Sequence, residues 1–216
     1  EEVLIEGAHH ISCTIEKLDL EKEYHVAVID EVQLIQDSIR GASWTRAILG
    51  ILSPEIHLCG ALNVKSLLIQ MITECGDEYE CIEYFRNIPL QFESTAYQLN
   101  KPIKGDALIA FSKKKVLELS RYYQDRGFKT SIIYGDLPPE VRRIQYQSFS
   151  EGQSELLIST DAIGMGVNLP IRRIVFVSAK KFDGEVVREL TSQEVKQIAG
   201  RAGRKGIYEI GYVTGL

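Results

Sequence analysis

Two arginines near the C-terminal end of the chain have a spacing that could serve phosphate chemistry. The stretch 197–204 reads QIAGRAGR, and the T-x-x-E pattern from Thr191 to Glu194 predicts that a helix starts just before it. On a continuous helix Gln197, Arg201 and Arg204 would share one side, because positions i, i+4 and i+7 are neighbours. Planar guanidinium groups suit phosphate oxygens. The spacing predicts an arginine-finger helix, and a solvated basic helix end is the alternative.

The opposite side of this predicted helix is apolar and is expected to face a core. It carries Val195, Ile198, Ala199 and Ala202 at i, i+3, i+4 and i+7. Gly200 and Gly203 would keep the helix surface low enough for a bulky ligand to approach.

Two adjacent acids form a second candidate site. Asp30 and Glu31 follow the continuous apolar run 26–29, which is typical of a strand buried on both faces of a parallel sheet. One carboxylate could hold Mg²⁺ while its neighbour orients or deprotonates an attacking water. Paired acids after a strand are common, but acids and arginines together favour phosphoryl transfer.

A third stretch, 159–170, reads STDAIGMGVNLP. Gly164 and Gly166 would let the backbone pass close to phosphate or ribose. Thr160 offers a hydroxyl to a nucleic-acid phosphate and Asn168 an amide to a ribose; taken singly, these residues are turn formers. The lysines at 113–115 could line a polyanion track or simply begin a solvated helix.

The elements that position these residues alternate between strand and helix. Repeated strand–helix units imply an α/β fold with parallel sheets, and ligands then gather beyond the carboxyl ends of the strands. Periodicity weakens between Arg86 and Gly105, so we expect a domain boundary near residue 88 and domains 1–88 and 89–216. Expected strands lie at 11–15, 26–29, 56–59, 107–111, 130–134, 156–158 and 173–178; expected helices lie at 44–52, 66–75 and 112–126, with a further one opened by Pro138 and Pro139.

Charge distribution, apolar runs and cysteine spacing limit the classes of protein to which the chain can belong. Residues 1–88 hold 6 Lys/Arg against 16 Asp/Glu, whereas residues 89–216 hold 19 against 14, so the second half is the better partner for a polyanion. No apolar run approaches the length of a membrane span, and no signal peptide is evident, so a membrane or secreted protein is not expected. The 4 cysteines show no C-x-x-C pair, which favours a reducing compartment over a zinc or disulfide framework.

Taken together, these motifs resemble those of superfamily-two helicases of the DExH type. DEVQ at 30–33, HLCG at 57–60, FSK at 111–113, STDAIGMGVNLP and QIAGRAGR stand in the order of motifs II to VI of that superfamily. SCTIE at 12–16, RGASWTR at 40–46 and IYGDLPP at 133–139 look most like the mitochondrial degradosome RNA helicase and its bacterial relatives. The resemblance covers nearly the whole chain and implies RecA-like domains, with ATP and Mg²⁺ as cofactors.

The resemblance also implies a role for each matching residue. Around the nucleotide, Asp30 would be the magnesium-linked carboxylate, Glu31 the general base and Gln33 a link to the opposite domain. Arg201 would meet the γ-phosphate, Arg204 would be the finger, Gln197 would assist them, and Gly166 and Asn168 would approach the ribose. Nucleic-acid contacts would come from Thr14, Ser112, Lys113 and Thr160, and coupling of hydrolysis to movement from His57, Cys59 and Gly60.

One departure from the family pattern limits the expected activity. The sequence contains no G-x-x-x-x-G-K-[ST] phosphate loop, which in this family lies upstream of the DEVQ box. We therefore expect residues 1–88 to be the later part of a first RecA-like domain, 89–216 to be a second, and this fragment alone to hydrolyse ATP poorly or not at all.

The function expected from the resemblance is the motor core of an ATP-dependent RNA helicase acting on single-stranded or partly duplex RNA. These motifs contact the nucleic-acid backbone and do not distinguish ribose from deoxyribose, so a DNA helicase or translocase is an alternative. An ATP-independent nucleic-acid-binding module and a nucleotide switch or scaffold within a degradation complex are also compatible with these motifs. The resemblance to a degradosome helicase is compatible with an exoribonuclease partner. The bacterial cytoplasm and the mitochondrial matrix are both compatible as the compartment.

Overall fold

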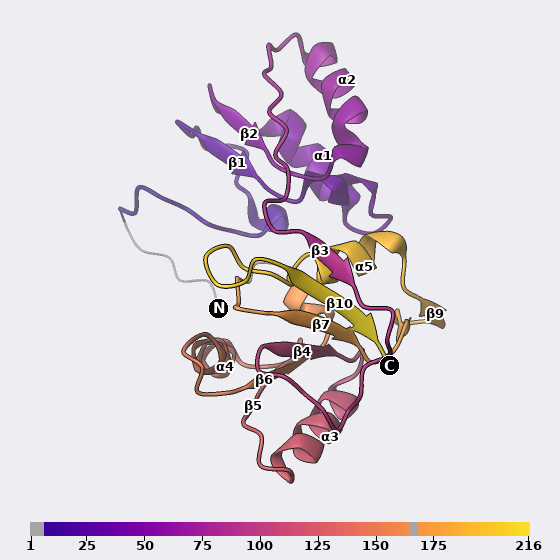
Figure 1. The fold of residues 1–216 in the computed structure, drawn as a ribbon. Coiled ribbons are helices and arrows are strands. Elements are labelled where there is room, and N and C mark those ends of the chain that lie inside the picture. Colours follow the sequence, from indigo (N-terminus) through magenta and orange to yellow (C-terminus); the bar gives the residue numbers. More distant parts are fainter. Residues whose placement is uncertain (1–6, 165–167) are drawn as a thin grey trace. The chain divides into compact units, whose positions relative to one another are not determined.

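The computed structural model describes residues 7–164 and 168–216, and the chain divides into two compact units, 1–83 and 84–216 (Figure 1). Each unit has its own buried core.

Unit 1 is built on two parallel strands, β1 (Ala27–Ile29) and β2 (Ile56–Leu58), with Val28 opposite His57. Its helices are α1 (Gly41–Gly50) and α2 (Lys65–Cys75), and its 3-10 turns are η1 (Ile15–Lys17), η2 (Val32–Gln36) and η3 (Leu62–Val64). The core consists of Ile29, Val32, Trp44, Ala47 and Val64, with further apolar side chains packed around it.

Two sequence-based expectations for unit 1 are wrong. The run 26–29 was expected to be buried on both faces, but only Ala27 and Ile29 are buried, while Val28 on the alternate face is 65% exposed. Residues 11–14, all of them described, form no strand, and the chain enters η1 at Ile15 instead. A β-prone composition is not sufficient where no neighbouring strand pairs with the segment.

Unit 2 contains a six-stranded sheet in which every pairing is parallel. Its strand order is β3-β10-β7-β4-β6-β5. The strands are β3 (Leu90–Phe92), β4 (Asp106–Ile109), β5 (Thr130–Ile133), β6 (Leu156–Ser159), β7 (Arg173–Phe176) and β10 (Gly211–Gly215). The α/β class with parallel sheets is therefore as predicted, although β3 and β10 were not foreseen.

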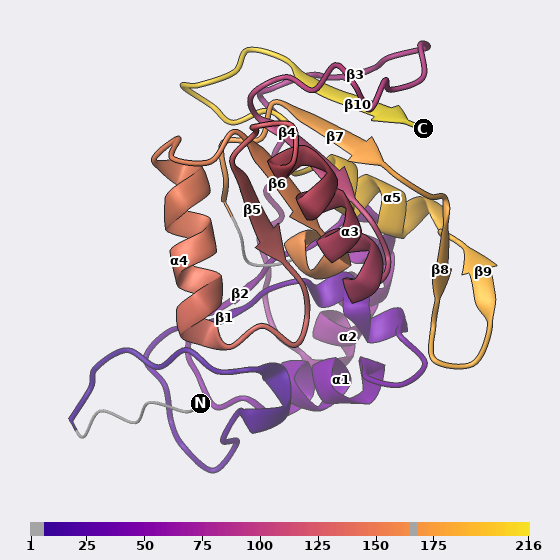
Figure 2. The ribbon, with the colours of Figure 1, turned by 90° about the horizontal axis from the view of Figure 1, so that it is seen from below.

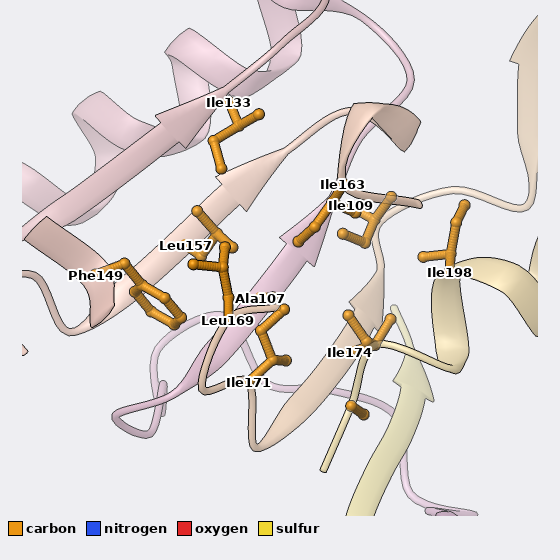
Figure 3. Packing of buried hydrophobic residues seen from close by; sticks show 11 residues of the cluster. Ala107, Ile109, Ile133, Phe149, Leu157, Ile163, Leu169, Ile171, Ile174 and Ile198 are labelled. Atoms are coloured by element: carbon orange, nitrogen blue, oxygen red, sulfur yellow. The ribbon is translucent and has the colours of Figure 1, made fainter. Parts of the chain in front are cut away.

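Helices cover both faces of this sheet because its central strands are apolar on both. They are α3 (Lys113–Gln124), α4 (Pro139–Ser150) and α5 (Ser192–Ala199), with a 3-10 turn η4 (Asp161–Gly164). Ala107 and Ile109 of β4 join a cluster with Phe149 of α4 and Ile198 of α5 (Figure 3), whereas Leu108 packs on the α3 side. Figure 2 shows α3 and α4 on the two sides of β5.

An antiparallel hairpin separates β7 from α5. It consists of β8 (Lys180–Phe182) and β9 (Val187–Glu189). Arg188 of the hairpin donates through both Nη atoms to the Glu194 carboxylate of α5, at 2.9 Å each, and this hydrogen bonding holds the pKa of Glu194 well below its usual range. The hairpin is thereby tied to the first turn of α5.

A buried ionic cluster lies at the amino ends of the central strands. Asp106 is fully buried and accepts from Arg173 Nε at 2.9 Å and from Arg173 Nη2 at 2.7 Å. The Tyr97 hydroxyl donates to the same carboxylate at 3.1 Å, and Glu93 accepts from Arg173 Nη1 at 3.1 Å. Because these buried charges are paired with one another, the cluster fixes β4 against β7 at the end opposite the predicted site.

Candidate nucleotide and nucleic-acid sites

The acidic pair of unit 1 lies at the carboxyl end of β1, and its backbone is strained there. Glu31 has φ 54° and ψ 38°, and it is the only non-glycine residue with a positive φ in the described part of the chain. This left-handed conformation costs about 1–3 kcal/mol for a residue of this type. The Glu31 N–H donates to Asp30 Oδ1 at 2.8 Å, so the turn aligns the two acids. Such strain is typical of functional sites.

Gln33 connects the acidic pair to the loop after β2. Its side chain is 8% exposed; Nε2 donates to Glu31 Oε2, and Oε1 accepts from the Ala61 N–H at 3.1 Å. The amide therefore orients the Glu31 carboxylate from within unit 1. The role expected from the resemblance, a link to the opposite domain, stays a prediction.

The predicted coupling stretch 57–60 lies directly against the DEVQ box. A Cβ on Gly60 would lie 2.6 Å from Val32 Cγ2 and 2.7 Å from Gln33 Oε1, so only glycine fits there. The Cys59 carbonyl accepts from the Val32 N–H at 3.0 Å, while the exposed His57 ring lies 2.8 Å from Glu55. Backbone contacts, more than the His57 side chain, join the two motifs.

Trp44 is a site residue that its sequence pattern did not single out. Its side chain lies in the core, 4% exposed, and Nε1 donates to the Asp30 carbonyl at 3.0 Å. The Arg40 guanidinium lies 5.3 Å from the centroid of the Trp44 ring and pairs with Glu16 at 2.7 Å. The run RGASWTR thus supports the backbone of the acidic pair, and the only advance signal was its resemblance to a family motif.

Thr14, the predicted nucleic-acid contact of unit 1, lies at the exposed N-cap position of η1. Its side chain makes no capping hydrogen bond there. The structure places it on the surface, and its contact with nucleic acid stays a prediction.

In unit 2 the predicted arginine-finger helix is shorter than expected. The Thr191–Glu194 capping box is present in both directions, but α5 ends at Ala199. Arg201 and Arg204 therefore project from the segment Gly200–Arg204, called here the arginine turn, and not from a helix face. After Ala199 the amides of Arg201 and Ala202 bond three residues back, and at Gly203 the backbone turns left-handed, with φ +78°.

Gly203 is closely packed by its neighbours, and the ligand access expected from its place in the sequence stays a prediction. A Cβ there would lie 2.6 Å from Ile88 Cγ2 and 3.0 Å from the Gly211 backbone. Ile198, Ala199 and Ala202 are buried, as expected of the apolar side, and Val195 is partly buried. The arginine turn is therefore pressed against the sheet.

The arginine turn contacts the stretch 159–170. Arg201 Nε donates to the Gly164 carbonyl at 3.0 Å, joined by Nη2, and Arg204 Nη1 donates to the Asn168 carbonyl at 3.3 Å. The Gln197 side chain lies 3.8 Å from the position of a Cβ on Gly164. These predicted residues are thus brought together, whereas Gly166 lies outside the described residues.

The predicted nucleic-acid contacts of unit 2 share one edge of the sheet. Ser112 and Thr160 follow the carboxyl ends of the paired strands β4 and β6. Ser112 Oγ accepts from the Lys115 N–H at 3.2 Å and so caps α3, and Thr160 Oγ1 accepts from the Ala162 N–H at 3.3 Å. Lys113 Nζ lies 5.0 Å from the Tyr134 ring beyond β5. The edge combines hydroxyls, a cation and an aromatic ring.

The fold and these sites define a RecA-like α/β protein. The structure is similar to two solved structures of S. cerevisiae Dbp5 L327V, one bound to RNA and ADP BeF3 (TM-score 0.63) and one bound to Gle1 H337R and IP6 (TM-score 0.61). Each is 17% identical and covers 89% of this chain, and the matches span 53% and 52% of the Dbp5 chains. Likeness at this identity shows the fold alone.

The sequence families are more specific. Residues 1–84 match the DEXQ-box helicase domain of Suv3, and residues 91–206 match the helicase conserved C-terminal domain. The chain therefore belongs to the helicases, with a Suv3-type DEXQ-box domain followed by a helicase C-terminal domain, as the motifs predicted.

Curated relatives agree with this assignment. The chain is 44% identical to the ATP-dependent RNA helicase SUV3, mitochondrial, of Candida albicans and 42% identical to SUV3L, mitochondrial, of rice, over 95% and 96% of this chain. It is 41% identical to human SUPV3L1, mitochondrial, over 91%. The chain spans 29%, 29% and 26% of these relatives, so they are much longer. None of the helices described for this chain is long and apolar enough to cross a membrane.

Proposed function

We propose that this chain is the motor core of an ATP-dependent RNA helicase, in which ATP hydrolysis drives movement along RNA or its unwinding. The observation that carries the proposal is the strained Glu31, whose carboxylate Gln33 orients beside Asp30. A general base must be held in a fixed direction to take a proton from an attacking water. The names of the relatives, all ATP-dependent RNA helicases, point to the same reaction.

Asp30 fits the role of magnesium ligand. Its exposed carboxylate is a hard oxygen donor, and Mg²⁺ is usually held by one or two carboxylates together with phosphates and waters. Residues 7–164 and 168–216 contain no group of three or more His, Cys, Asp or Glu side chains able to hold a metal ion alone. In this proposal Asp30 would hold the ion jointly with the nucleotide, and the ion would supply positive charge to the phosphates.

Arg201 and Arg204 are proposed to act on the phosphates. Both guanidiniums contact backbone carbonyls of the stretch 159–170, so their positions are set before nucleotide binds. Positive charge held in place can stabilise the charge that develops in phosphoryl transfer. Gln197, whose side chain lies beside Gly164, is proposed to assist them, and Gly166 and Asn168 are proposed to approach the ribose.

The carboxyl edge of the unit 2 sheet is proposed to contact the nucleic-acid backbone. Ser112, Lys113 and Thr160 lie there, and Thr14 of unit 1 is proposed as a further contact. His57, Cys59 and Gly60 couple hydrolysis to movement through the backbone contacts of Gly60 and Cys59 with the DEVQ box. Backbone contacts alone do not select RNA over DNA, so a DNA translocase is the second candidate.

The proposed setting follows the relatives, whose names place them in mitochondria. We propose the mitochondrial matrix as the compartment, with bacterial cytoplasm as the second candidate, and an exoribonuclease as a partner in RNA degradation. If the full-length protein copurified with no nuclease, the proposal of an exoribonuclease partner would be contradicted.

The test is ATP hydrolysis by the full-length protein with single-stranded RNA, single-stranded DNA or neither. Glu31→Gln is the matched control, because it keeps the size of the side chain and removes the base. We expect strong stimulation by RNA that the control abolishes. Equal stimulation by DNA would favour the translocase, and no turnover under any condition would favour an ATP-independent binding module.

A further inference from the structure

Arg86, which belongs to none of the sequence motifs described above, binds the arginine turn through hydrogen bonds. Its side-chain donors all go to main-chain carbonyls within the described residues: Nη1 to Gly200 at 2.6 Å, Nη2 to Ala202, and Nε to Ile88. A guanidinium offers five N–H donors in a fixed plane, so it can bind several carbonyls at once. Partial burial of the group lowers the pKa of Arg86.

The Gly200 and Ala202 carbonyls lie just beyond the end of α5. The helix stops at Ala199, and the amides of Arg201 and Ala202 then donate to the Ile198 and Ala199 carbonyls, three residues back. The planar guanidinium reaches Gly200 and Ala202 together, which flank Arg201. One side chain therefore binds the backbone on both sides of Arg201.

The arginine turn is held on its other side by different contacts. Arg201 donates to the Gly164 carbonyl, and the Gly203 N–H donates to the Ile171 carbonyl at 2.8 Å. Ile88 packs against Gly203 from the Arg86 side. The turn is thus held between Gly164 and Ile171 on one side and the segment 86–88 on the other, so the loss of either side would release it.

We propose that Arg86 is a positioning residue for the two arginines of the phosphate site: it fixes the arginine turn so that Arg201 and Arg204 meet the nucleotide in a productive direction. This proposal rests on the proposed ATP hydrolysis. A displacement of about 1 Å at a catalytic group can lower the rate about 100-fold. Arg86 itself touches no nucleotide in this proposal.

The test compares Arg86→Ala and Arg86→Lys with the wild type in the full-length protein. We expect Arg86→Ala to lower kcat for RNA-stimulated ATP hydrolysis at least about tenfold, with a smaller change in KM for ATP. Millimolar guanidinium chloride should restore part of kcat in Arg86→Ala, since it refills the donor site. Arg86→Lys should recover less, because one ammonium cannot span the carbonyls that the planar guanidinium reaches.

Arg126→Ala is the matched control. Arg126 also donates to a main-chain carbonyl, that of Tyr122 at 2.9 Å, and stacks on that ring at 3.6 Å, but it lies at the end of α3. Its kcat should equal the wild-type value, and guanidinium should not raise it. An unchanged kcat in Arg86→Ala, or a loss that guanidinium does not restore and that follows a lower melting temperature, would overturn the positioning role.

Hydrogen exchange separates failure of this proposal from failure of the proposed function. Arg86→Ala should speed amide exchange in residues 200–206 and leave exchange in β4 and β6 unchanged. If the wild type hydrolyses no ATP, the proposed function fails, and faster exchange in this segment still shows that Arg86 holds the turn. Exchange equal to the wild type would show that it does not.

Discussion

At the scale of single residues, the site depends on side chains that hold neighbouring residues in place. Glu31 keeps a left-handed backbone because Gln33 binds its carboxylate and Asp30 accepts its N–H. Trp44 fixes the Asp30 carbonyl from the core. Strain of this kind persists only where the surroundings over-determine it, and each of these contacts comes from within unit 1.

Arg204 is the residue whose removal should separate catalysis from folding. Its hydrogen bond to the Asn168 carbonyl is long, at 3.3 Å, so little folding energy depends on it. We expect Arg204→Ala in the full-length enzyme to lower kcat about 1,000-fold while sparing nucleotide binding, because a finger acts on transition-state charge.

Turnover, nucleotide affinity and melting temperature measured on the same preparation check this prediction. A melting temperature that falls several degrees would instead make Arg204 a structural residue. Wild-type turnover in the variant would remove it from the catalytic set.

At the scale of elements, the arginine turn shows where sequence periodicity stops being informative. The positions of Gln197, Arg201 and Arg204 fit one helix face, and the capping box was correctly predicted. Helix spacing cannot reveal that Gly203 turns left-handed because Gly211 and Ile88 pack against it. The helix ends earlier still, at Ala199, where the next amides bond three residues back, and helix spacing does not reveal that change either.

Gly203 should therefore tolerate no side chain. We expect Gly203→Ala to lower the free energy of unfolding by about 3 kcal/mol, through left-handed strain and the clash with Ile88 and Gly211. Gly206→Ala is the matched control, because Gly206 has φ +83° and open space around it, and should cost only about 1 kcal/mol. Urea unfolding of both variants measures the difference, and equal losses would show that backbone strain alone is responsible.

The strands of unit 2 also differ in whether the sequence predicts them. The strands β4, β6 and β7 lie inside the sheet and were predicted near their observed bounds, because they are apolar and largely buried. The edge strand β5 was also predicted near its bounds. The two strands at the opposite edge escaped prediction: β3 is three exposed residues, and β10 begins and ends with glycine. Both are strands only because they pair with a neighbour that local composition does not reveal.

At the scale of the whole molecule, the chain consists of two units with separate cores. Unit 2 carries its ionic cluster at the amino ends of β4 and β7, where buried Asp106 accepts from Arg173, from Tyr97 and from the Ile103 N–H at 2.8 Å. Neutralising this buried carboxylate would remove the negative charge that pairs with the Arg173 guanidinium, and the buried cation would then be poorly compensated.

Asp106→Asn should be among the most damaging conservative changes. We expect it to lower the free energy of unfolding of unit 2 by about 3 kcal/mol or more, because Arg173 keeps only Glu93 as a carboxylate partner among the described residues. Glu118→Gln removes an exposed carboxylate 3.5 Å from Lys115 and should cost less than about 0.5 kcal/mol. Denaturant unfolding followed by circular dichroism compares the two, and similar losses would contradict the importance of burial.

The place of β10 between β3 and β7 has a consequence for synthesis on the ribosome. In the six-stranded sheet β3 pairs with β10 alone, so the first strand of unit 2 to be made must wait for β10, which is made after all the others. Long-range pairing of this kind closes late in folding. Ile88 and Gly211 complete the packing around Gly203 only at that moment. A nascent chain therefore completes the packing around Gly203 only as β10 emerges, so a chain that stops before β10 lacks the finished arginine turn.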